Sequence, residues 1–160
     1  MKARLFFPDQ SAIDQFLAQA SQSPFSYTAI FGTQSDQQVK GFDNDHHSIM
    51  LGRGEKVWNA AQKVLTGWDQ FPSAWTRILP TVPLEEGRVV AVLFNLFGLW
   101  WINAARIVYT IDEPNRFGFA YGTLEDHVET GEECFWIERA ASGEISYHIR
   151  AFSRPSHWLV

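Results

Sequence analysis

The sequence has little of several features that would place it in a broad functional class. It holds a single cysteine, Cys134, so no disulfide can form within the chain, which fits a reducing compartment such as the cytoplasm. Lys and Arg total 13 against 18 Asp and Glu, a formal net charge of −5, and no basic block is interleaved with aromatic residues. A nucleic-acid partner is therefore not expected.

Long apolar runs and familiar catalytic motifs are also lacking. The longest apolar stretch, between Arg88 and Arg106, falls short of the roughly 20 residues that a spanning helix needs, and it contains two asparagines and a glycine. The apolar run near the start is short and broken by Pro8, unlike a signal peptide. No G-x-S-x-G nucleophile elbow occurs. We expect no membrane span and no cofactor.

Aromatic residues, by contrast, are abundant. Seven Trp and 13 Phe stand among 160 residues, and such side chains bury large areas and often line cavities or interfaces. The length suits a single domain, residues 1–160, that can bury a core of ordinary size. An aromatic core and an aromatic pocket are both compatible with this composition.

The spacing of apolar residues predicts two helices and a series of strands. One helix is expected over about residues 11–21 with Ser11 as its N-cap, and a second in GEKVWNAAQKVLTGW, ended by Gly67. Residues 22–45 indicate a loop, followed by a short strand around residues 49–51. Further strands are expected at Trp75–Leu79, Val89–Phe94, Ala105–Asp112, Arg116–Thr123, Glu132–Arg139 and Glu144–Phe152. Their short connections predict an antiparallel meander.

Alternation along the later strands indicates one apolar face. Phe117, Phe119 and Tyr121 alternate with very small residues, and the small residues permit strong bending of the sheet. A curved sheet with an aromatic concave face follows, and something must cover that face. The residues predicted to bind a ligand there are Trp101, Asn103, Tyr109, Phe117, Phe119, Tyr121 and Tyr147.

Three segments resemble a known family over nearly the whole chain. They are LGRGEKVWNAAQKVL, GLWWINAARIVYTIDEPNRFGFAYGTLEDHVETGEECFWIE and YHIRAFSRPSHWLV. Their elements G-L-W-W-x-N-A, F-G-F-A-Y-G-T-L, H-x-x-x-G-E-E and A-F-S-R-P resemble, in the same order, those of the uncharacterised family called domain of unknown function nineteen-ninety. The resemblance implies no established activity.

The layout also looks like a distant relative of the helix-grip superfamily of START and Bet v 1 proteins. That resemblance implies an α+β fold with two helices and a curved antiparallel sheet of about six to seven strands. In the superfamily the sheet wraps a C-terminal helix, and an apolar cavity lies between the sheet and that helix. The family continues into a basic terminal helix, whereas this sequence stops at Val160, so the C-terminal helix is expected to be missing. Another element or a second subunit would then cover the concave face.

The acidic stretch around His127 offers the strongest polar candidates. A histidine beside carboxylates could form an acid–base pair or bind a metal, so His127, Glu132 and Glu133 are candidate catalytic residues. The family carries these three as a motif. A charged hairpin loop over 124–131 is usually only solvated, however, and the spacing matches no zinc motif. We interpret the stretch as the rim of the concave face.

Other polar segments are interpreted as structural. DNDHHS, residues 43–48, lacks the glycine and glutamate of a calcium loop and is expected to be a polar loop, so no metal site is predicted. Cys134 is expected to be a small core side chain. For Asn103, Arg106 and Arg154 a ligand-binding role and a structural role stay equally open.

Three functions remain for this sequence. The first is a module that binds a small apolar molecule in the concave aromatic face. The second is an enzyme that uses His127 with Glu132 or Glu133 as acid and base on an apolar substrate. The third is an interaction protein, in which a homodimer covers the concave face.

Overall fold

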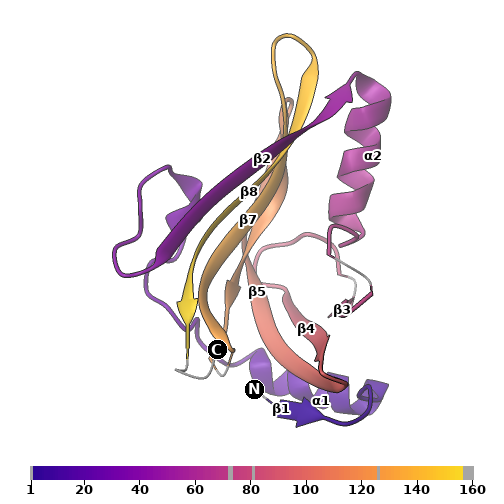
Figure 1. Ribbon diagram of the computed structural model, residues 1–160, viewed down its shortest axis with the longest axis vertical. Coiled ribbons are helices and arrows are strands. Elements are labelled where there is room, and N and C mark those ends of the chain that lie inside the picture. The colour runs from indigo at the N-terminus through magenta and orange to yellow at the C-terminus, as the bar shows by residue number, and fades with distance from the viewer. Residues whose placement is uncertain (1, 72–73, 81, 126, 157–160) are drawn as a thin grey trace.

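The computed structural model describes residues 2–71, 74–80, 82–125 and 127–156, and shows an α+β fold with one curved antiparallel sheet and two α-helices (Figure 1). No α-helix in these ranges is long and apolar enough to cross a membrane. The elements in chain order are β1 (Lys2–Arg4), α1 (Gln10–Ala20), the 3-10 helix η1 (Gly32–Gln34), β2 (Asp43–Arg53), α2 (Glu55–Thr66), β3 (Thr76–Leu79), β4 (Val89–Leu96), β5 (Leu99–Glu113), β6 (Arg116–Thr123), β7 (Glu129–Arg139) and β8 (Glu144–Pro155).

The strands form a single sheet in the order β2-β8-β7-β6-β5-β4-β3, and every neighbouring pair is antiparallel. From β3 to β8 each strand pairs with the next along the chain, which confirms the predicted meander. β6 pairs with residues 105–113 of β5, and β1 pairs with residues 100–102 of the same strand. β2 and β3 are the two edges, so the sheet stays open.

Both predicted helices are confirmed, with one correction at an N-cap. The carboxylate of Asp9, rather than the Ser11 hydroxyl, caps α1 by accepting from the backbone N–H of Ala12 at 2.8 Å. The predicted polar loop at residues 43–48 is wrong, because these residues lie in β2, which spans eleven residues. β2 is an edge strand with mostly exposed side chains, so polar residues are tolerated there. The strand therefore lacks the alternation of apolar and polar residues by which strands are predicted.

One face of the sheet, here called the concave face, carries Phe119 and Phe135 and gathers the main core. The alternation predicted along β6 is confirmed, since Phe119 is fully buried on this face. α2 covers part of the face with Trp58 and Leu65, and Trp68 in the next segment packs on Phe119 with ring centroids 4.6 Å apart. This aromatic part of the concave face is therefore covered from within the chain.

The opposite, convex face carries α1. Ile13 of α1 packs against Leu93 and Ile102, so the two helices lie on opposite faces (Figure 1). Arg106, left open by the sequence, has a structural role: its guanidinium donates to the carbonyls of Ser21 and Ser23 at 3.0 and 2.8 Å, where α1 ends. These contacts fix the chain as it leaves the helix.

Candidate functional site

A small cavity of about 90 Å³ opens on the concave face beyond the part that α2 covers. It brings together residues of the ends of β6, β7 and β8 and of the loop between β6 and β7. Two of the three predicted catalytic side chains, those of His127 and Glu133, take part in it. The residues that line the cavity are Tyr121, Thr123, His127, Glu129, Gly131, Glu132, Glu133, Ala151 and Ser153.

A tyrosine–glutamate pair forms the polar centre of this cavity. Tyr121 and Glu133 are directly opposite each other on β6 and β7, and the Tyr121 hydroxyl donates to Oε2 of Glu133 at 2.9 Å. Burial, with a smaller contribution from Glu129, raises the pKa of Glu133. Burial and the Glu133 carboxylate together raise the pKa of Tyr121 well above its ordinary value, so the phenol stays a neutral donor.

His127 lies at the rim, in the loop that joins β6 to β7. Its side chain is half-buried, and its Nδ1 lies 3.0 Å from both the backbone nitrogen and the carbonyl oxygen of Glu129. Burial lowers the pKa of His127 to about 4, so the ring is neutral at pH 7. The cavity therefore combines a neutral phenol, a neutral imidazole and a carboxyl group that resists ionisation.

Glu132, the third predicted catalytic residue, is separated from this cavity's polar pair. Successive side chains of a strand point to opposite faces, so Glu132 lies on the convex face and is only 2% exposed. Its two carboxylate oxygens accept four hydrogen bonds: from the Tyr27 hydroxyl at 2.8 Å, from the backbone N–H groups of Phe31 and Thr33 at 3.0 Å each, and from the Thr33 hydroxyl. No lone pair is left for a substrate, and Glu132 anchors the loop before β2.

The predicted ligand-binding residues divide between the two faces. Phe117, Phe119 and Tyr147 belong to or border the aromatic cluster beneath α2. Tyr109 does not share their face: a bulge at Val108 shifts the register between β5 and β6, which turns Tyr109 to the convex face. There its hydroxyl lies 2.8 Å from the Thr33 hydroxyl.

Trp101 and Asn103 do lie on the concave side of β5, below the aromatic cluster. Asn103 is 1% exposed, and its Oδ1 accepts from the backbone N–H of Val128 at 3.3 Å. Nδ2 of Asn103 and Nε1 of Trp101 are buried donors without a hydrogen-bond partner in the described part of the chain. Buried donors of this kind are rare and point to a partner such as water or a ligand group.

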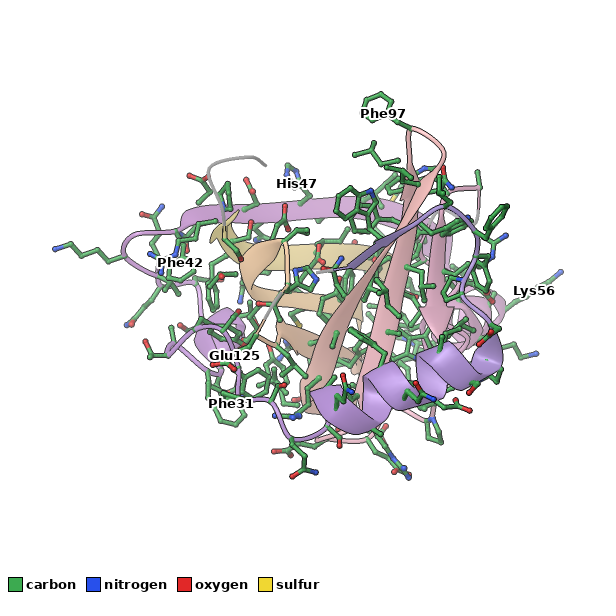
Figure 2. All side chains as sticks on the ribbon, turned by 90° about the horizontal axis from the view of Figure 1, so that it is seen from below. Phe31, Phe42, His47, Lys56, Phe97 and Glu125 are labelled. Carbon is green, nitrogen blue, oxygen red and sulfur yellow. The ribbon has the colours of Figure 1, made fainter. Side chains whose placement is uncertain are left out.

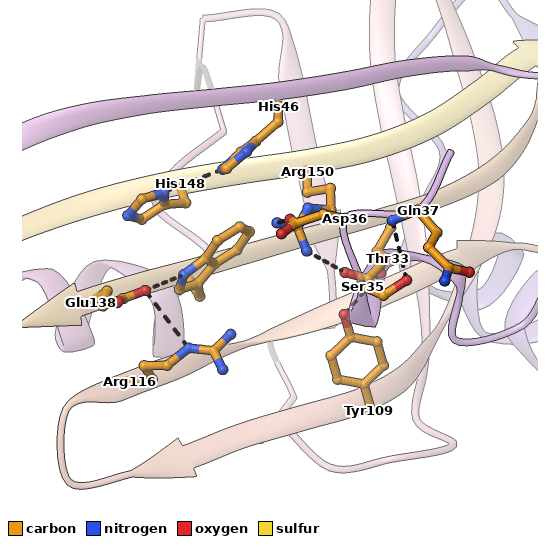
Figure 3. Close-up of polar contacts among 11 residues, drawn as sticks. Thr33, Ser35, Asp36, Gln37, His46, Tyr109, Arg116, Glu138, His148 and Arg150 are labelled. Carbon is orange, nitrogen blue, oxygen red and sulfur yellow. Dashed lines mark hydrogen bonds and ion pairs between the residues drawn. The ribbon is translucent and has the colours of Figure 1, made fainter. Parts of the chain in front are cut away.

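A second polar cluster, on the convex face, was not predicted from the sequence (Figure 3). Trp136 stacks on His148 with ring centroids 4.6 Å apart, and Nε2 of His46 lies 3.3 Å from Nδ1 of His148. The Arg150 guanidinium lies over the Trp136 ring and pairs with the carboxylate of Asp36. Because these residues come from β2, β7, β8 and the loop before β2, no local sequence motif could predict that they form a cluster.

The convex cluster gives no sign of metal or thiol chemistry. Among the described residues there is no group of three or more His, Cys, Asp or Glu side chains that could hold a metal ion. Cys134, which lies on this face, is buried, and burial raises the pKa of its thiol to about 11. Arg154 lies over the ring of Phe42 at 4.6 Å, a structural contact.

Comparison with known proteins gives the family but no activity. The chain belongs to the family described as "Domain of unknown function (DUF1990)", whose model matches residues 26–160. It is similar to a UPF0548 protein of Dictyostelium discoideum, with 33% identity over 95% of this chain and 81% of the relative. A UPF0548 protein of Arabidopsis thaliana is 32% identical over 84% of this chain and 69% of the relative.

A solved structure shares the fold. The crystal structure of a hypothetical protein, jhp0584, from Helicobacter pylori superposes with a TM-score of 0.51 and 9% identity, over 84% of this chain and 80% of that one. At this identity the likeness concerns the fold alone. The family model and the UPF0548 relatives confirm the predicted family, and the helix-grip likeness stays an analogy.

The two neighbouring glutamates should respond oppositely to neutralisation. In Glu132→Gln an amide NH₂ would face backbone donors, so we expect a loss of about 2–4 kcal/mol in the free energy of unfolding. In Glu133→Gln the uncharged side chain suits a site that already resists ionisation, so stability at pH 7 should stay within about 1 kcal/mol or rise. Urea unfolding of both variants measures this, and equal losses would contradict the assignment of faces.

His127 should make stability depend on pH. Its folded pKa lies below the ordinary value of 6.5, so the unfolded chain binds the proton more readily. Its contribution is fully present above pH 6.5 and is lost as the pH falls toward 4, by about 1–3 kcal/mol. Compared with the parent, His127→Gln should lose less stability between pH 7 and pH 4.5 in urea unfolding. An unchanged pH profile would show that the ring is not buried in solution.

Proposed function

We propose that the protein binds a small, uncharged molecule with an apolar body and a hydroxyl or amide end group in the open part of the concave face. The observation that carries the proposal is the Tyr121–Glu133 pair, a buried polar pair at the border of an aromatic wall. Ligand sites of this kind are mostly apolar, with a few convergent polar groups that fix orientation. The analogy with helix-grip proteins, which hold apolar ligands against a curved sheet, supports the same reading.

The chemistry of the cavity favours a neutral end group. The Tyr121 hydroxyl already donates its hydrogen to one oxygen of Glu133. The carboxyl group of Glu133 therefore has lone pairs left that can accept from a donor on the ligand. An anionic ligand would find no Lys or Arg among the residues that line the cavity, and nearby Glu129 would repel it. Because the cavity holds only about 90 Å³, it suits the end group, while the apolar body would lie along the concave face toward Trp101.

A displacement assay tests this proposal. Using the uncharged dye Nile red as the fluorescent probe, 1-decanol should displace the dye better than decanoate does. Glu133→Leu should weaken decanol binding about tenfold, the effect of one buried hydrogen bond. The matched control is Glu138→Leu, since Glu138 lies on the same strand and bonds Trp136 on the convex face. Failure of decanol to displace the dye, or equal losses in both variants, would reject the proposal.

A second candidate is an enzyme that uses the same cavity. It is favoured by one observation: His127 and Glu133 line one cavity, and both have pKa values displaced from the ordinary range by burial. In this reading neutral His127 is the base and Glu133 the acid, while Glu132 takes no part.

Turnover tests this alternative directly. For any apolar substrate found by screening, His127→Ala should lower kcat by about 100-fold or more, the usual contribution of a general base. Glu132→Asp would serve as a comparison that perturbs the convex face only. If His127→Ala keeps full turnover, the enzyme reading is wrong, whereas ligand binding through Glu133 would be untouched.

A further inference from the structure

The two edges of the sheet differ in how well they are protected against pairing with another strand. β3 has four residues and is followed directly by Pro80, and short length and proline are usual protective features of an edge. β2 runs for eleven residues, from Asp43 to Arg53, and contains no proline and no lysine. In the described part of the chain β2 pairs with β8 on one side and with no strand on the other. Its outer side is therefore a template for a further strand.

β2 is also open to solvent along its length. Figure 1 shows β2 at the border of the sheet beside β8, and Figure 2 shows His47 of this strand pointing away from the body of the molecule. Every residue of β2 except Asn44 and Gly52 is exposed. Residues 43–50 pair with β8 without a break, and the register shifts once, between Met50 and Gly52. Most of β2 is thus a regular ladder that another strand could extend.

Exposed apolar side chains of β2 lie on both faces of the sheet. Ile49, which is 62% exposed, is opposite Tyr147 and lies on the concave face. Met50, which is 63% exposed, is opposite Ser146 and lies on the convex face. A partner docked on one face would cover only one of these two side chains. A strand added at the edge brings a neighbouring side chain to each face, so it covers both.

The charges of β2 make the strand complementary to a second copy of itself. Near its start lie Asp43 and Asp45, whose carboxylates have no ion pair in the described part of the chain. At its end the Arg53 side chain is 65% exposed and pairs with Glu144 at 2.9 Å, an exposed contact that contributes little. In an antiparallel pair of β2 strands the acidic start of each lies beside the basic end of the other. A parallel pair would bring like charges together.

We propose that the protein forms a symmetric dimer in which the β2 strands of two copies pair antiparallel and join the two sheets into one. A two-fold interface uses the same surface on both copies, which suits a strand whose two ends carry opposite charges. The contact lies at an edge of the sheet and not on the concave face. None of the residues that line the concave cavity belongs to β2, so the dimer does not rest on the proposed function.

Sedimentation equilibrium at a series of protein concentrations tests the dimer. The parent protein should change from monomer to dimer as the concentration rises. Ile49→Lys should raise the dissociation constant about tenfold or more, because a lysine on an edge strand opposes pairing with another strand. The matched control is Phe97→Lys, at a 95% exposed side chain in the turn between β4 and β5, and it should associate like the parent. A parent that stays monomeric throughout, or equal losses in both variants, would overturn the proposal.

Charge reversal at the two ends of β2 tests the antiparallel arrangement. Asp43→Arg and Arg53→Asp should each raise the dissociation constant about tenfold, since the two-fold axis makes each contact occur twice. A double variant that carries both changes should recover the association of the parent. Positions 43 and 53 lie about 33 Å apart along one strand, so this recovery cannot arise within a single chain. A double variant that associates no better than the single variants would contradict antiparallel pairing of β2.

Discussion

The burial of the Glu132 carboxylate is the constraint on which the convex side of this protein depends. A carboxylate at this depth is tolerated only if its lone pairs are satisfied, and here the loop before β2 supplies every donor. Tyr27, one of those donors, packs where a Cβ at Gly122 would stand, 2.0 Å from its hydroxyl oxygen. These contacts hold the loop against β6 and β7. Because the loop leads directly into β2, they also fix where β2 begins its pairing with β8.

The concave side differs from the convex side, because its strands carry aromatic side chains in one part and a polar pair in another. Near α2 the aromatic side chains are packed against Trp58 and Trp68 and behave as an ordinary core. Beyond that cover the same strands carry Tyr121 and Glu133, whose burial makes ionisation unfavourable. The protein thus keeps polar groups on a face that is otherwise apolar, which is the usual arrangement of a ligand site.

The parts of the fold that were predicted correctly are those with strong local signals. α2 has a clear apolar stripe and a glycine stop, and β6 has strict alternation, so both were found with nearly the right ends. The wrong predictions lie where the position of a strand in the sheet, or a bulge in it, overrode the local sequence pattern. The bulge at Val108 moved Tyr109 to the other face, and the edge position of β2 let polar residues form a strand. Neither effect leaves a mark in the sequence nearby.

The sequence by itself determined the family, the α+β class, the order of the meander and the aromatic concave face, because periodicity and short turns act over a few residues. It also named His127 and Glu133 as polar candidates. Only the tertiary structure separated Glu132 from Glu133 and paired Glu133 with Tyr121 in a shared cavity. It alone set β1 beside the turn at Phe97. Those relations join residues distant in the chain, and they depend on strand register, which the whole sheet fixes.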